Sequence, residues 1–104
     1  MPVDAPAVQA DLVRRLRCAE GHLRGIAAMI ERGDDCQTVI HQTLAVQAAI
    51  REINRRLLAH HLEHCLFAGL RDSDAPARER LLSDIVSLYQ LVDAHGRWRM
   101  ADSR

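Results

Sequence analysis

The chain has 104 residues, enough for one domain, and its 14 basic and 14 acidic residues give a formal net charge of zero. Hydrophobic residues make up 48% and aromatic residues only 3%, so the core must be built from Leu, Ile, Val and Ala, which favours an all-α fold. No apolar run approaches the ~18 residues of a membrane span, and the N-terminus lacks the features of a signal peptide. We therefore expect a cytoplasmic protein with no membrane partner, whose three cysteines act as ligands or reactive thiols.

The first predicted helix covers about residues 11–32 and follows a flexible arm at 1–10. From Leu12 to Ile30, apolar residues recur at steps of four and three, which is the spacing of a helix stripe. Asp4 or Asp11 could cap its start, and Gly33 is the expected stop at its end.

The second predicted helix is long, because the sequence from Cys36 to about Gly69 holds no internal proline or glycine. Asp34 or Asp35 is its expected N-cap. At ~1.5 Å per residue, its roughly 33 residues span about 50 Å, whereas a compact domain of this length has a radius of gyration of only about 13 Å. One chain cannot cover such a rod, so we expect the helix to pack against its own copy.

A third helix is expected to begin with Asp74 as its N-cap and Pro76 in its first turn, and to end near Gly96. A tail at 97–104 follows it. The organisation predicted from these patterns is an arm at 1–10, a single helical domain at 11–96 and the tail. Three-helix protomers would form an antiparallel helix-bundle dimer.

Three residues are candidate metal ligands. His61 and Cys65 are four residues apart and face the same side of one helix. Cys36 lies about 37 Å away along that helix at ~1.5 Å per residue, so one chain cannot join all three. In an antiparallel pair centred near Ala49 and Ile50, however, Cys36 faces His61 and Cys65 of the second copy. Two thiolates and one imidazole favour Cu(I), with other transition metals as alternatives.

The sequence resembles the copper-sensing repressors of the CsoR type. The similarity covers about residues 11–92 and rests on the motifs Arg15-Leu16-Arg17, Glu20-Gly21-His22-Leu23-Arg24-Gly25-Ile26, Met29-Ile30, Cys36, Ala45-Val46-Gln47-Ala48 and Leu57-Leu58-Ala59-His60-His61-Leu62-Glu63-His64-Cys65. The resemblance implies an all-α dimer, usually assembled as a tetramer. Its apo form binds operator DNA without a helix-turn-helix and is released by the inducer. It also implies Cys36, His61 and Cys65 as the copper ligands.

The chain departs from this pattern at two positions, and related branches offer alternative inducers. Asp35 stands where the copper branch often has Tyr, and Leu81 stands near the place of a Glu that supports the ligating His. Relatives that sense nickel have His at the position of Cys65, and relatives that sense persulfide lack a His at the position of His61. Cys65 and His61 therefore speak against these two inducers. The formaldehyde branch uses Pro2 with Cys36, both present here, but it lacks Cys65.

Arginines are the candidate DNA contacts, since all 14 basic residues are Arg. Arg14 and Arg15 lie on the first helix, and Arg51 and Arg55 lie in the middle of the second. A two-fold axis would double each patch, so a neutral protein can still present a basic face to phosphates. No nucleophile–base set, phosphate-binding glycine loop or paired-carboxylate pocket indicates an enzyme.

Overall fold

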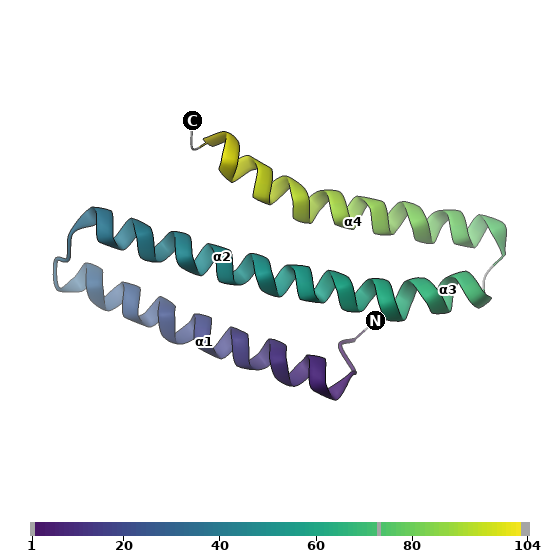
Figure 1. The fold of residues 1–104 in the computed structure, drawn as a ribbon, viewed down its shortest axis with the longest axis horizontal. Helices are drawn as coiled ribbons and strands as arrows, with labels where there is room; N and C mark the ends of the chain where they lie inside the picture. The colour runs from purple at the N-terminus through teal and green to yellow at the C-terminus, as the bar shows by residue number, and fades with distance from the viewer. Residues whose placement is uncertain (1, 73, 103–104) are drawn as a thin grey trace. The chain divides into compact units, whose positions relative to one another are not determined.

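The computed structural model describes the backbone of residues 2–72 and 74–102, and within these ranges it leaves out the side chains of 65–66, 70, 72 and 93–102. The elements in the described ranges are helices, which confirms the all-α prediction (Figure 1). They are α1 (Pro6–Glu31), α2 (Cys36–His61), the π-helical turn η1 (Leu62–Leu66), α3 (Phe67–Asp72) and α4 (Ala75–Asp102). The chain divides into two compact units, Asp4–Ile53 and Met1–Val3 with Asn54–Arg104, which are described separately.

In the first unit, α1 and the N-terminal part of α2 form an antiparallel hairpin (Figure 1). The α1 stripe supplies three buried residues seven positions apart, Leu12, Ala19 and Ile26. Val46 and Ile53 are buried on α2. The spacing of seven is the heptad repeat of packed helices, and this unit therefore uses half of the apolar stripe predicted for α1.

Gly33 ends α1 as predicted, with a φ of 79° that a residue with a side chain rarely adopts. The Gly33 N–H donates to the Ile30 carbonyl at 3.1 Å, and the Asp34 N–H donates to the Met29 carbonyl at 2.9 Å. These two bonds form a Schellman motif, which satisfies carbonyls left free at the helix end. Arg32 is paired with Asp34 at 2.6 Å, and the hydrogen bond and charge of Asp34 raise the pKa of Arg32.

In the second unit, α4 runs antiparallel to α3 and contacts both α3 and η1 (Figure 1). Leu58, His60 and Ile85 are buried here. Asp74 caps α4 as predicted, because its Oδ1 accepts from the Ala77 N–H at 2.9 Å.

The helix bounds differ from the sequence prediction at three places. First, α1 begins at Pro6, not near Asp11, because proline is tolerated at the first helical position; Ala5 precedes it with no side-chain cap. Second, α4 continues through Gly96 to Asp102, because a glycine inside a helix costs only about 1 kcal/mol. Third, the long second helix is interrupted by η1 before it continues as α3 to Asp72. The division into an arm at 1–10, a domain at 11–96 and a tail at 97–104 stays a prediction.

Within the described residues, none of the helices is long and apolar enough to cross a membrane.

Candidate metal centre and nucleic-acid interface

Cys36 is the first residue of α2, and its thiol is free and exposed. Asp35 positions this helix end, since its Oδ2 accepts from the Gln37 N–H at 3.1 Å and from the Thr38 N–H at 3.4 Å. The next apolar residues on the Cys36 side, Ile40 and Leu44, are 51% and 41% exposed. Cys36 therefore stands at the end of an apolar stripe that its own unit leaves uncovered.

His61 is the last residue of α2 and belongs to the second unit. It is half-buried and lines a cavity of about 270 Å³. The other residues around this cavity are mostly apolar: Val3, Asn54, Leu57, Leu58, His60, Leu88 and Val92. Leu88 and Val92 come from α4, so the structure places the predicted imidazole ligand beside that helix.

Cys65 lies within η1, and its side chain is outside the described residues. A π-helical turn has more residues than an α-helical turn, and such turns often occur at functional sites. Four residues therefore advance the chain by slightly less than one turn between His61 and Cys65, whereas the sequence prediction assumed an uninterrupted α-helix. In both cases, the two positions stay near one side of the helix.

The three candidate ligands do not belong to one unit: Cys36 lies in the first, and His61 and Cys65 lie in the second. In the part of the chain that the structure describes, no group of three His, Cys, Asp or Glu side chains is arranged to hold a metal ion. The predicted site between two protomers is not tested by a single chain, and it stays a prediction. Pro2, the candidate reactive partner of Cys36, is exposed in the second unit.

Arg14 and Arg15 share one carboxylate on α1. Asp11 accepts from Arg14 Nη2 at 2.7 Å and from Arg15 Nε at 3.1 and 3.2 Å. The Arg15 side chain is 30% exposed, against 65% for Arg14. Sequence analysis missed this role of Asp11, although spacings of three and four residues on a helix could have indicated it.

A small pocket of about 200 Å³ lies beside these arginines in the first unit. It is lined by Arg14, Arg15, Cys18, Ala19, His22 and Ala49. His22 Nε2 lies 2.7 Å from Gln42 Oε1, and this hydrogen bond ties α1 to α2. The arginine-bearing surface of α1 is therefore fixed to the helix that begins with Cys36.

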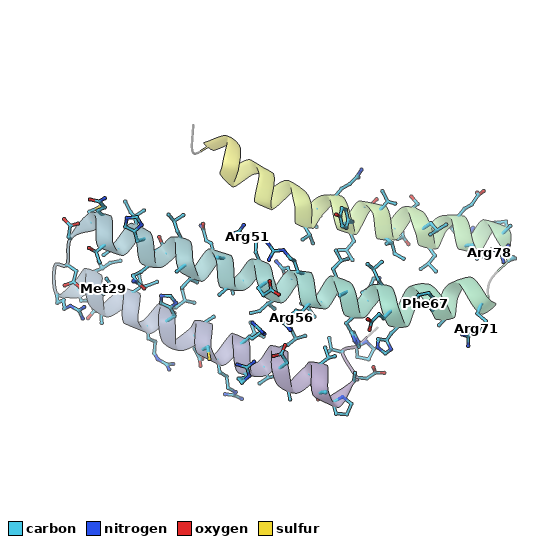
Figure 2. The ribbon with its side chains drawn as sticks, in the orientation of Figure 1. Met29, Arg51, Arg56, Phe67, Arg71 and Arg78 are labelled. Atoms are coloured by element: carbon cyan, nitrogen blue, oxygen red, sulfur yellow. The ribbon has the colours of Figure 1, made fainter. Side chains whose placement is uncertain are left out.

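The arginines predicted in the middle of α2 lie on both sides of the boundary between the units. Arg51 is half-buried in the first unit, and Arg55 is exposed in the second. Figure 2 shows Arg51 and Arg56 as long side chains projecting from α2. Arg55 and Arg56 are both exposed in the second unit.

Comparison with known proteins identifies the chain's relatives. Residues 8–93 match the family of metal-sensitive transcriptional repressors. The chain belongs to this family. The copper-sensing transcriptional repressor RicR of Mycobacterium tuberculosis is 37% identical over 76% of this chain and 82% of its own length. The copper-sensing transcriptional repressor CsoR of the same strain is 32% identical over 93% of this chain and 82% of its own length.

A solved structure supports the assignment. The copper-sensing repressor CsoR with Cu(I) from Geobacillus thermodenitrificans superposes with a TM-score of 0.74 and 26% identity. The match covers 88% of this chain and 91% of that one. The predicted family and fold class are therefore confirmed, and membership of the metal-sensitive repressor family identifies a DNA-binding regulator rather than an enzyme.

Within the metal-sensitive repressor family, the two departures noted in the sequence have structural roles in this chain. Asp35 is the N-cap of α2. Leu81 on α4 lies against Gly69 on α3, one turn beyond Cys65. Asp35 directly precedes the candidate ligand Cys36, and Leu81, being apolar, has no side-chain group that could hydrogen-bond to His61.

Proposed function

We propose that this protein represses transcription as a copper sensor: the apo form binds operator DNA in the cytoplasm, and Cu(I) releases it. Cu(I) is held by Cys36 of one protomer and by His61 and Cys65 of its partner. The observation that carries this proposal is the exposed stripe formed by Cys36, Ile40 and Leu44 on α2. A thiol at the end of an uncovered apolar helix face is suited to a site that a second copy completes.

The apolar surface of α1 also supports an oligomer. Leu16, Leu23 and Ile30 are 49%, 53% and 61% exposed and repeat at seven-residue intervals. They form the other half of the predicted stripe, whose first half is buried within the hairpin. A repeated row of exposed large apolar residues indicates a protein interface. We infer a dimer that pairs again into a homotetramer.

The donor set supports copper as the inducer. Two thiolates and one imidazole are soft ligands, which select Cu(I) over oxygen-preferring ions. RicR and CsoR, the relatives compared above, are both copper-sensing. These two arguments favour Cu(I) over Ni(II) and over the formaldehyde chemistry of Pro2 and Cys36.

The DNA surface is assigned to arginines on both helices. Arg15 is oriented by its bond to Asp11 and is partly exposed, so it can present a guanidinium to phosphate. Arg55 is exposed on α2. Arg14, beside Arg15 in the sequence, and Arg51, one helical turn before Arg55, are the other two arginines of the proposed DNA surface. Because Arg14 and Arg15 lie on a hairpin that includes Cys36, a metal that pulls on Cys36 can displace them.

The test is a titration of reduced protein on DNA. A duplex that the apo protein itself selects from a random-sequence pool serves as operator, and binding is followed by fluorescence anisotropy without oxygen. We expect one Cu(I) per protomer to release the DNA, whereas equal Ni(II) or formaldehyde does not. Release by formaldehyde and not by copper would assign sensing to Pro2 and Cys36 instead. Failure to select any duplex would contradict the repressor function.

A further inference from the structure

His60 is a buried polar side chain of the second unit that has no hydrogen-bond partner. Its side chain is 5% exposed, and neither Nδ1 nor Nε2 has a partner among the described residues. A neutral imidazole carries one donor and one acceptor, and leaving both unpaired in a buried position destabilises the fold. Such a group in a native structure calls for an unseen water or ion as its partner.

A second imidazole lies next to it. The ring centroids of His60 and His64 are 4.3 Å apart, and their planes are inclined by 36°. His64 is 45% exposed, and its Nε2 lies 4.0 Å from the Glu63 carboxylate. His60 also lines the cavity of about 270 Å³. The two rings are therefore close together, one of them beside a cavity and the other partly exposed to solvent.

We propose that His60 and His64 bind a divalent metal ion of the Zn(II) or Ni(II) class. Imidazole nitrogens suit these ions, and the ion would give His60 the partner that the protein does not supply. A carboxylate beside a ligating histidine commonly orients its ring. Glu63 lies beside His64 and would have this role. Because no third His, Cys, Asp or Glu converges there in the described part of the chain, water completes the coordination.

This site differs from the proposed copper site in position and in chemistry. His60 and His64 each precede a proposed copper ligand by one residue, which is a rotation of about 100° around a helix. Both imidazoles come from one chain, so the site needs no partner protomer. Nitrogen donors alone, without thiolate, favour a borderline divalent ion over Cu(I). The inference therefore stands whether or not the copper proposal is correct.

The test measures Zn(II) binding to the reduced full chain carrying Cys36→Ala and Cys65→Ala, in competition with a chromogenic chelator. We expect one Zn(II) per chain. His60→Leu and His64→Ala should each weaken binding by about tenfold or more, since even the loss of a group that only supports a ligand costs that much. His41→Ala, which removes an exposed imidazole from the first unit, is the matched control and should bind as its parent does.

Two results would overturn the proposal. Unchanged Zn(II) affinity in both His60→Leu and His64→Ala would show that water alone is the partner of His60. Loss of binding in His61→Ala but not in His60→Leu would assign the ion to His61. If circular dichroism shows that His60→Leu does not fold, the decisive comparison is between the parent chain and His64→Ala. Zn(II) should raise the melting temperature of the parent and not that of His64→Ala. The copper proposal is tested separately, by Cu(I) titration with the cysteines intact.

Discussion

Asp35 stabilises the helix end that carries the proposed copper ligand Cys36. Its carboxylate accepts two backbone N–H groups of the first turn of α2. Asp35→Ala should lower the free energy of unfolding by about 1 kcal/mol, the usual contribution of an N-cap. Urea denaturation measures this. Asp35→Asn keeps a side-chain acceptor and should stay close to the parent protein, so an equal loss in both variants would mean that charge matters and not capping.

Cys65 should be essential for copper affinity and not for DNA affinity. Cys65→Ala leaves one thiolate and one imidazole in the proposed site, a set much less suited to Cu(I). We expect the Cu(I) affinity to fall by orders of magnitude, measured by competition with a chromogenic Cu(I) chelator. Apo DNA binding should be close to the parent. Cys18→Ala, which removes a free exposed thiol elsewhere, should change neither quantity; a normal copper response by Cys65→Ala would exclude the proposed ligand set.

The residues that cap or terminate the helices were largely predictable, because each acts through its nearest neighbours in sequence. Gly33, Asp35 and Asp74 occupy the predicted stop and cap positions. The cap expected from Asp4 or Asp11 is wrong, since Asp11 bonds two arginines inside α1 instead. The burial of His60 was not predictable either, because its surroundings include residues far away in sequence, such as Val3 and Leu88.

At the scale of elements, Gly69 permits the close approach of α3 and α4. A Cβ added at Gly69 would collide with the Leu81 side chain. Two effects oppose each other in Gly69→Ala: the collision destabilises by about 1–3 kcal/mol, and the higher helix propensity of alanine stabilises by up to about 1 kcal/mol. We expect a net loss of stability, measured by thermal unfolding.

A double-mutant cycle separates these effects. In a Leu81→Ala background the collision is absent, so the same Gly69→Ala change should stabilise α3 by up to about 1 kcal/mol. Stabilisation by Gly69→Ala in both backgrounds would show that Leu81 moves aside without cost, and destabilisation in both would show that the loss does not come from the collision. The result matters for sensing because α3 directly follows the turn that contains Cys65.

The helices themselves were predictable from apolar spacing, while the π-helical turn was not. The steps of four and three predict one continuous helix through His61 and Cys65, and no proline or glycine marks Leu62–Leu66. The turn contacts α4, an element further along the chain, and apolar spacing does not report such a contact. Sequence periodicity therefore identified the candidate ligands but not the local backbone that holds Cys65.

At the scale of the whole molecule, the exposed row on α1 should drive oligomerisation. Leu16→Glu with Leu23→Glu places two charges in that row, and burying unpaired charges is strongly unfavourable. We expect the double variant to sediment as a monomer of 11.7 kDa. Gly21→Glu with Ala28→Glu adds the same charges at the same seven-residue spacing on another exposed part of α1, and it should assemble normally. Loss of assembly in both variants would mean that net charge, not the row, controls association.

We expect the link from copper to DNA release to depend on His61, because this proposed copper ligand borders a cavity that α4 also lines. Leu88 and Val92 of α4 line the same cavity as His61, and the second ring nitrogen of a ligating histidine can engage a neighbouring group. Metal and DNA must favour different arrangements of the protomers, with a reciprocal coupling of ordinarily ~1–3 kcal/mol. His61→Ala should therefore keep much of its Cu(I) affinity through two thiolates but lose most of the copper-driven release.

Arg55→Ala is the complementary variant, because it should weaken apo DNA binding without changing Cu(I) affinity. Losing one phosphate contact also lowers the slope of log affinity against log salt concentration, by about 0.9 for each contact in duplex DNA. If Arg55 is duplicated by a two-fold axis, each dimer loses two such contacts, and the slope should fall by about twice that amount. Anisotropy titrations of both variants, with and without one Cu(I) per protomer, give all of these quantities. Full release of DNA by copper from His61→Ala would show that the two thiolates carry the coupling without the imidazole.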